Sequence, residues 1–187
     1  MTDTKPPSLS DRLPGDPSRE ERIARMLRVD HAGEYGAVRI YEGQLAVLGR
    51  TPAGAVIRNM AAQEKKHLDR FDRLLPQRRV RPTLLGPVWH VAGFALGAAT
   101  ALLGERAAMA CTVAVEEVID EHYAAQAEAL GEEEPELRST LEEFRRDELA
   151  HRDEGLAHGA EQATGYDALT AGIKAASRLA IWLSTRL

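Results

Sequence analysis

Apolar residues recur at steps of three and four along most of the chain, which is the spacing of one face of an α-helix. The alternation typical of β-strands is hard to find. This pattern and the breakers "GRTPAG", "PQRRVRP" and "TGYD" predict six helical segments. They cover about residues 18–49, 52–75, 83–104, 105–130 and 135–163, with a last helix from the "TGYD" turn to the C-terminus. The sequence therefore predicts an all-α fold.

Local capping signals support these boundaries. Ser18 and Glu21 form an S-x-x-E capping box that opens the first helix. Gly131 ends the fourth segment, and Pro135 stands where a first-turn proline is favoured. The segment before the first helix is rich in Pro, Ser and Asp. We therefore expect residues 1–18 to form a disordered tail and 19–187 to form one domain.

The apolar stripe on each of four long helices is interrupted by acidic residues or histidine. The stripes read Ile23, Leu27, Asp30, Glu34, Val38, Tyr41, Leu45 and Leu48; Ile57, Met60, Glu64, His67, Phe71 and Leu74; Met109, Thr112, Glu116, Ile119, Tyr123 and Leu130; and Leu137, Leu141, Phe144, Glu148, His151 and Gly155. An amphipathic helix turns such a stripe toward the core. The pattern therefore places carboxylates and imidazoles at predicted core positions.

These interruptions repeat along the chain. Glu34 is followed 30 residues later by Glu64-x-x-His67, and Glu116 is followed 32 residues later by Glu148-x-x-His151. The two halves resemble a tandem duplication of a helix hairpin. Each hairpin supplies one single glutamate and one Glu-x-x-His pair, whose members share a helix face.

Four carboxylates in one core need compensation, because burying an unpaired charge costs several kcal/mol. Two metal ions would supply it and would leave room for two neutral imidazoles. This ligand set is the one described for ferritin-like di-iron and di-manganese bundles, and it suits iron or manganese better than zinc or copper. We expect a ferritin-like four-helix bundle with two additional helices. The alternative is that the two Glu–His pairs are solvated at the helix surface. The stripes would then have to point outward on four helices.

Two interpretations stay open for the polar residues near the predicted ligands. Asp30 and Asp120 lie one turn from Glu34 and Glu116, where they either orient the imidazoles or carry charge on the helix surface. His31 lies either beside the site or at the surface. We interpret His90 and His158 as structural residues, with an interfacial role as a further option for His90.

Composition excludes several classes of function. The net charge of -5 argues against nucleic acid as a partner. The single cysteine, Cys111, excludes a disulfide framework and any thiolate-rich metal site, and we expect a packed, inert thiol. The N-terminus has no apolar signal-peptide core, so the default expectation is a cytoplasmic protein.

Residues 82–104 carry no full charge at neutral pH. The run is long enough to cross a bilayer, but Pro87, His90 and several Gly and Ala make it only moderately hydrophobic. We favour an apolar helix lying in the membrane interface, with Trp89 and Phe94 as anchors and the arginines at 78, 79 and 81 near lipid phosphates. A membrane-spanning helix and an interface with a partner protein or second copy are the alternatives.

Several long blocks resemble the demethoxyubiquinone hydroxylase family of ubiquinone biosynthesis. They include "RVDHAGEYGAVRIYEGQLAVLGR", "QEKKHL", "AMACTVAVEEVIDEHY" and "RDELAHRDEGLAH", and the resemblance extends from about residue 25 to 187. It implies a ferritin-like di-iron monooxygenase that hydroxylates the ring of 3-demethoxyubiquinol (2-polyprenyl-3-methyl-6-methoxy-1,4-benzoquinol) with O2. Its six family ligands fall on the six stripe residues, Glu34, Glu64, His67, Glu116, Glu148 and His151.

The resemblance also implies roles and surroundings for the site. Glu64 and Glu148 would bridge the two irons, and His122 and Tyr123 would contact substrate or pass electrons to the irons. The reductant would be NADH or the quinol itself, although no Rossmann-type nucleotide motif is present. The expected location is the cytoplasmic face of the cell inner membrane, as a peripheral protein. The possible protein partners are a second copy of the chain and an accessory protein that presents the lipid substrate.

Four other functions could use a similar bundle. A ferritin-like iron-storage protein would have no use for the uncharged run. A manganese catalase-like enzyme is a second alternative, whereas a rubrerythrin-like peroxidase lacks the CxxC pair of its usual electron carrier. A membrane scaffold with a vestigial site would not keep six ligands in register.

Overall fold

The computed structural model describes residues 15–187, and every regular element among them is helical. The helices are α1 (Arg19–Leu48), α2 (Ala53–Gln77), α3 (Gly86–Leu102), α4 (Glu105–Leu130), α5 (Pro135–Ala157) and α6 (Tyr166–Ser184), with a short 3-10 turn at Ala160–Gln162. The predicted all-α class is confirmed. Most of the tail predicted at residues 1–18 lies outside the described residues, so the division into tail and domain stays a prediction.

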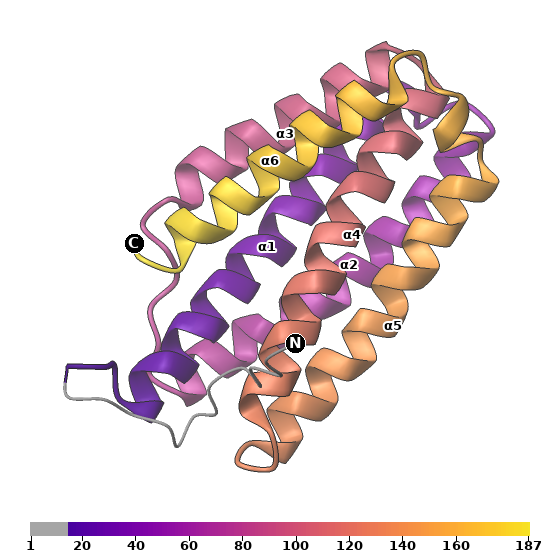
Figure 1. Cartoon of the computed structure of the whole chain (residues 1–187). Helices are drawn as coiled ribbons and strands as arrows, with labels where there is room; N and C mark the ends of the chain where they lie inside the picture. Colours follow the sequence, from indigo (N-terminus) through magenta and orange to yellow (C-terminus); the bar gives the residue numbers. More distant parts are fainter. Residues whose placement is uncertain (1–14) are drawn as a thin grey trace.

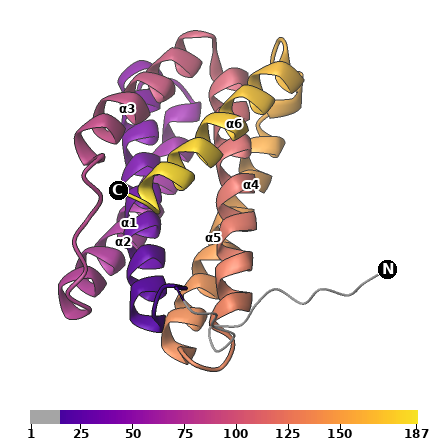
Figure 2. The same ribbon diagram turned by 60° about the vertical axis from the view of Figure 1, so that its left-hand side comes forward.

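Four helices, α1, α2, α4 and α5, run side by side as a bundle, and α3 and α6 lie along its outside (Figure 1). Turning the molecule shows α3 against α1, with α6 reaching across to α4 (Figure 2). The C-terminus returns to the start of α3, where the Leu84 N–H donates to the Leu187 carbonyl oxygen. This is the predicted four-helix bundle with two additional helices.

The predicted helix ends are close to the observed ones, except at the end of the fifth helix. The capping box forms as predicted, because the Ser18 side chain accepts from the Glu21 N–H and the Glu21 side chain accepts from the Ser18 N–H. The predicted end of the fifth helix near residue 163 is wrong. Gly159 adopts a left-handed conformation (φ 78°), which ends α5 at Ala157 and starts the 3-10 turn.

The predicted stripes form the core of the bundle. Every stripe residue on α2, α4 and α5 is buried, including Gly155, whose missing Cβ would come within 2.9 Å of Val113. On α1, Val38 and Leu45 are only half-buried, because α1 also turns a second face toward α3. Cys111 is fully buried, and burial raises the pKa of its thiol to about 12, in keeping with a packed, inert residue.

Helix α3 approaches α1 so closely that glycine is required on both sides. A Cβ at Gly97 would lie 1.9 Å from the Ile40 carbonyl oxygen, and one at Gly43 would lie 2.2 Å from that of Phe94. The opposite side of α3 exposes Val88, Val91 and Leu102. No helix among the described residues has the length and apolar character needed to cross a membrane.

Candidate metal centre

Six side chains from the four bundle helices meet in the interior. They form two overlapping groups, Glu34, Glu64, His67 and Glu148, and Glu64, Glu116, Glu148 and His151. Within each group one ligand atom per residue lies within 4.8 Å of the others, and every member is buried. The structure thus brings together all six predicted ligands. Glu64 and Glu148 belong to both groups, as expected of residues that bridge two ions.

The buried polar atoms of this cluster fit a pair of cations. In the described part of the chain, hydrogen-bond partners are lacking for both carboxylate oxygens of Glu64 and Glu148, one oxygen each of Glu34 and Glu116, and Nδ1 of both His67 and His151. Buried polar atoms are normally satisfied, and unsatisfied ones indicate an ion or water that belongs there. Oxygen and imidazole nitrogen are ligands that iron and manganese accept.

The pKa values of the cluster also indicate that cations fit between these side chains. Burial raises the pKa of Glu64 and Glu116 well above the ordinary range, and the nearby charge of Glu148 raises both further. For His67, burial lowers the pKa, but the carboxylates of Glu148 and Glu34 outweigh it and bring the pKa to about 12. Without metal, therefore, the cluster holds protons where the bound cations would sit.

Both histidines turn the same nitrogen inward. Nδ1 of His67 lies 3.2 Å from Glu148 Oε1, and Nδ1 of His151 lies 2.9 Å from Glu64 Oε1. The outward Nε2 of His67 lies 3.0 Å from Asp147 Oδ2. The corresponding nitrogen of His151 lies 3.3 Å from Gln63 Oε1. The stripes did not predict Asp147 or Gln63, yet each immediately precedes a Glu-x-x-His glutamate.

Two tyrosines make reciprocal contacts with the single glutamates. The Tyr41 hydroxyl on α1 donates to Glu116 Oε1 on α4 at 2.7 Å, and the Tyr123 hydroxyl on α4 donates to Glu34 Oε1 on α1. Tyr123 was a predicted catalytic residue, whereas the role of Tyr41 was missed. The repeated spacing could have indicated it, because each tyrosine stands seven residues after the single glutamate of its own helix.

The second predicted catalytic residue, His122, lies beside this cluster. Its Nε2 is 3.2 Å from Asp30 Oδ1, and Gln126 Nε2 donates to the same Asp30 oxygen at 2.8 Å. Asp30 is buried, and burial raises its pKa despite the contact with His122. The structure therefore connects Asp30 to His122 and not to the imidazoles of the predicted metal ligands.

The remaining polar candidates lie away from the site. Asp120 accepts from Arg145 at 2.6 Å, so the surface interpretation holds for it. His31 pairs with Asp72, His90 contacts the Tyr35 hydroxyl at 2.6 Å, and His158 contacts Glu154. These three histidines have structural contacts only among the interactions described.

Comparison with known proteins places this architecture in a family. Residues 21–184 match the family model described as "Ubiquinone biosynthesis protein COQ7". The chain belongs to the COQ7 family. A relative from Rhodospirillum rubrum, named 3-demethoxyubiquinol 3-hydroxylase, is 62% identical over 178 residues, covering 95% of this chain and 84% of that protein.

Several eukaryotic relatives are named NADPH-dependent 3-demethoxyubiquinone 3-hydroxylase, mitochondrial. The human protein is 57% identical over 169 residues, covering 88% of this chain and 78% of its own length. The Caenorhabditis elegans protein is 44% identical over 174 residues, covering 91% of this chain and 93% of its own length. The resemblance inferred from the sequence blocks is therefore confirmed at the level of the family.

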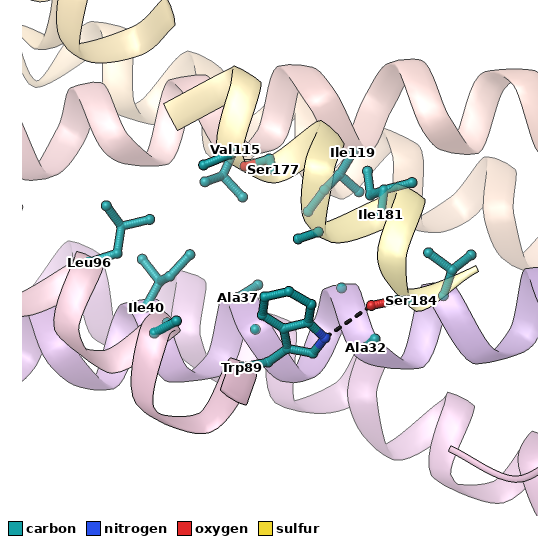
Figure 3. A pocket seen from close by; sticks show the side chains of 17 residues that line it. Ala32, Ala37, Ile40, Trp89, Leu96, Val115, Ile119, Ser177, Ile181 and Ser184 are labelled. Carbon is teal, nitrogen blue, oxygen red and sulfur yellow. Dashed lines mark hydrogen bonds between the residues drawn. The ribbon is translucent and has the colours of Figure 1, made fainter. Parts of the chain in front are cut away.

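On the helices that carry the carboxylate–histidine cluster, this COQ7 family chain contains an apolar cavity of about 170 Å³ (Figure 3). Its walls come from α1, α3, α4 and α6 and consist mostly of aliphatic and small side chains. Gly33 and Ala37 flank Glu34 on α1, and Val115 precedes Glu116 on α4. The cavity is therefore bounded by the same two helices that carry the single glutamates.

Trp89 closes one side of this cavity. Its indole ring faces the interior, and its Nε1–H donates to Ser184 Oγ on α6 at 3.0 Å (Figure 3). Trp89 is half-buried, and an indole N–H that leaves water usually finds such a partner. Trp89 therefore lines the cavity and does not project outward as the predicted membrane anchor. Phe94, the other predicted anchor, is half-buried beneath the Arg39 guanidinium.

Proposed function

We propose that this chain hydroxylates the ring of 3-demethoxyubiquinol with O2, using two iron ions held by the six buried ligands. The observation that carries the proposal is the pair of overlapping carboxylate–histidine groups in a chain of the COQ7 family. The name of the Rhodospirillum rubrum relative, 3-demethoxyubiquinol 3-hydroxylase, supports the substrate. One oxygen atom enters the ring, and the other leaves as water after two electrons and two protons are supplied.

In this proposal each residue of the cluster has a defined task. Glu64 and Glu148, which belong to both groups, would hold both ions; Glu34 and His67 would complete one site, and Glu116 and His151 would complete the other. Bound iron supplies the electrons and coordination positions that activate O2. The hydroxyls of Tyr41 and Tyr123 fix the orientation of the two single glutamates. The buried setting of the cluster excludes water from the reacting centre.

The apolar cavity supports the substrate assignment. A quinol ring with a polyprenyl tail needs a dry, aliphatic path, and the cavity walls provide that chemistry on the two helices that carry Glu34 and Glu116. Tyr123 touches Glu34, and His122 touches Asp30 one turn away. We place these two residues between the substrate and the metal ligands, where they contact the substrate or pass electrons.

The outer surface supports attachment to a membrane as a peripheral protein. The exposed large apolar residues gather on and around α3 and α6, and include Leu84, Val88, Val91, Leu102, Leu103, Leu179 and Trp182. Arg79 and Arg81 are exposed at the start of this region, whereas Arg78 is engaged by Glu134 at 2.8 Å. An apolar face with cationic neighbours fits anionic lipid surfaces. We assign this face to the cytoplasmic side of the cell inner membrane.

The sequence-based prediction gave NADH or the quinol itself as the electron donor, and of these we favour a reduced nicotinamide. Several eukaryotic relatives, among them the bovine and human proteins, are named NADPH-dependent, which supports a reduced nicotinamide in general. The partners we propose are a second copy of the chain, as a homo-oligomer, or an accessory protein that presents the lipid substrate.

The test uses the full-length chain loaded with two equivalents of iron. The reduced protein is offered O2 and a short-tailed demethoxyubiquinol, and the products are analysed by mass spectrometry. The proposal predicts a product heavier by one oxygen atom. Failure to form it while two irons remain bound would refute the hydroxylase assignment. Accumulation of a ferric core would support storage instead, and rapid H2O2 disproportionation by the manganese form would support a catalase.

A further inference from the structure

The two halves of the bundle hold each other's histidines. His67 on α2 contacts Asp147 on α5 through Nε2 at 3.0 Å, and His151 on α5 contacts Gln63 on α2 through Nε2 at 3.3 Å. Asp147 and Gln63 occupy equivalent places, immediately before Glu148 and Glu64. The repeat is therefore symmetric in position but not in chemistry, because one partner is a carboxylate and the other is a neutral amide.

The inward position of Nδ1 identifies it as the imidazole atom that would bind the metal. Nδ1 of each histidine faces the ligand carboxylates, at 3.2 Å from Glu148 Oε1 for His67 and 2.9 Å from Glu64 Oε1 for His151. With a metal ion on Nδ1, the remaining proton would be on Nε2, which would donate to Asp147 or Gln63. A ligand histidine becomes a better electron donor when its other N–H is given to a carboxylate, and a charge-assisted hydrogen bond is stronger than a neutral one.

Other contacts of the ligands are matched between the two groups. Both groups share Glu64 and Glu148. Each single glutamate accepts one tyrosine hydroxyl, Glu34 from Tyr123 and Glu116 from Tyr41. Among the hydrogen bonds that the ligands make to surrounding side chains, the contrast between Asp147 and Gln63 is thus the clear asymmetry.

We infer that the two metal sites are unequal, that Asp147 makes the His67 site the tighter one, and that this site fills first. Asp147 and Gln63 act as positioning residues through the imidazoles, without touching the metal. The inference rests on the proposed di-iron function. A chain that binds no iron would refute that function, whereas two irons that fill without preference refute only the ranking of the sites.

The test follows the first iron by isotope. The metal-free full-length chain receives one equivalent of ⁵⁷Fe(II), then one equivalent of ⁵⁶Fe(II), and a Mössbauer spectrum records only the first isotope. Glu116→Ala and Glu34→Ala, each lacking one terminal carboxylate, give reference spectra for the His67 site and the His151 site. We expect most ⁵⁷Fe in the wild-type chain to give the spectrum of the His67 site. An equal division, or a preference for the His151 site, would overturn the inference.

Two isosteric variants then change the charge without changing the shape. Asp147→Asn should lower the iron affinity of the His67 site by about tenfold, at the lower end of the effect of losing such a partner. Gln63→Glu should strengthen the His151 site by a similar factor. The double variant exchanges the two chemistries, so we expect ⁵⁷Fe to move to the His151 site while total iron stays at two per chain. A purely structural role would leave the filling order unchanged in all three variants, and that result would contradict the inference.

Discussion

The metal-free protein should lose stability as the pH rises, a direction opposite to ordinary acid denaturation. Burial raises the pKa values of Glu64 and Glu116 well above the ordinary range, and raises that of Glu148 as well. Contacts with Glu148 and Glu34 bring the pKa of His67 to about 12. The folded metal-free chain therefore keeps protons that the unfolded chain releases. Because the folded state binds more protons, the free energy of unfolding falls with increasing pH.

The magnitude follows from the number of retained protons. Each proton that only the folded state keeps lowers the free energy of unfolding by about 1.4 kcal/mol per pH unit. One such proton lowers the free energy of unfolding by about 2.7 kcal/mol between about pH 5.5 and pH 7.5. This is a large part of the ~5–15 kcal/mol that is typical for the free energy of unfolding of a protein. For a chain of this size, the melting temperature should fall by about 5–11 °C over that range. Arg78 lowers the pKa of Glu134, so the contribution of Glu134 to stability is lost only at lower pH. It does not affect the slope in this pH range.

The assay is urea or thermal unfolding, followed by circular dichroism, of the metal-free chain at several pH values. Glu64→Gln is the matched variant, because it keeps the shape of the side chain and removes one titrating group, so its slope should be shallower. Iron loading should flatten the slope further, since the cations replace the protons. A metal-free wild-type chain whose stability is constant or rises between these pH values would refute the reasoning.

Three further changes test separate parts of the structure. Tyr41→Phe removes the hydroxyl that donates to buried Glu116, and it should lower the free energy of unfolding by about 1–3 kcal/mol in urea titrations; no loss would show that this contact is unimportant. Gly97→Ala forces a Cβ to 1.9 Å from the Ile40 carbonyl oxygen and should destabilise the chain by about 1–3 kcal/mol, whereas Gly172→Ala, which meets nothing within 4 Å, should not. Leu179→Glu combined with Trp182→Glu should weaken binding to anionic vesicles, measured by co-sedimentation, by at least about tenfold. The control Ala62→Glu, at an exposed position on α2, should have little effect. Equal vesicle binding by the double variant and the control would contradict the membrane assignment.

The ligand set could be predicted because it interrupts apolar stripes of regular period. Glu148 and His151 stand at positions where Leu141 and Phe144 require the helix to face inward, so the helical repeat alone placed them in the core. The same argument located Tyr123. These residues depend only on the direction in which their own helix faces, and that direction is encoded locally.

The contacts between helices could not be predicted in the same way. Gln63 and Asp147 lie at the edge of their stripes and look like ordinary surface polar residues. Their hydrogen bonds to the opposite histidine depend on how α2 and α5 are rotated against each other, which no local pattern specifies. The inward turn of Trp89 likewise depends on Ser184, 95 residues away on α6. The apolar cavity shares this origin, because four helices build it.

The most direct test of the central claim is the fate of labelled oxygen. The reduced chain with two irons is given ¹⁸O2 and a short-tailed demethoxyubiquinol in unlabelled water, and the ring product is examined by mass spectrometry. If the six buried ligands hold a di-iron site that hydroxylates the ring, the product will contain one ¹⁸O atom. A hydroxylated product whose new oxygen comes from water, or no product at all from protein that retains both irons, would contradict the account.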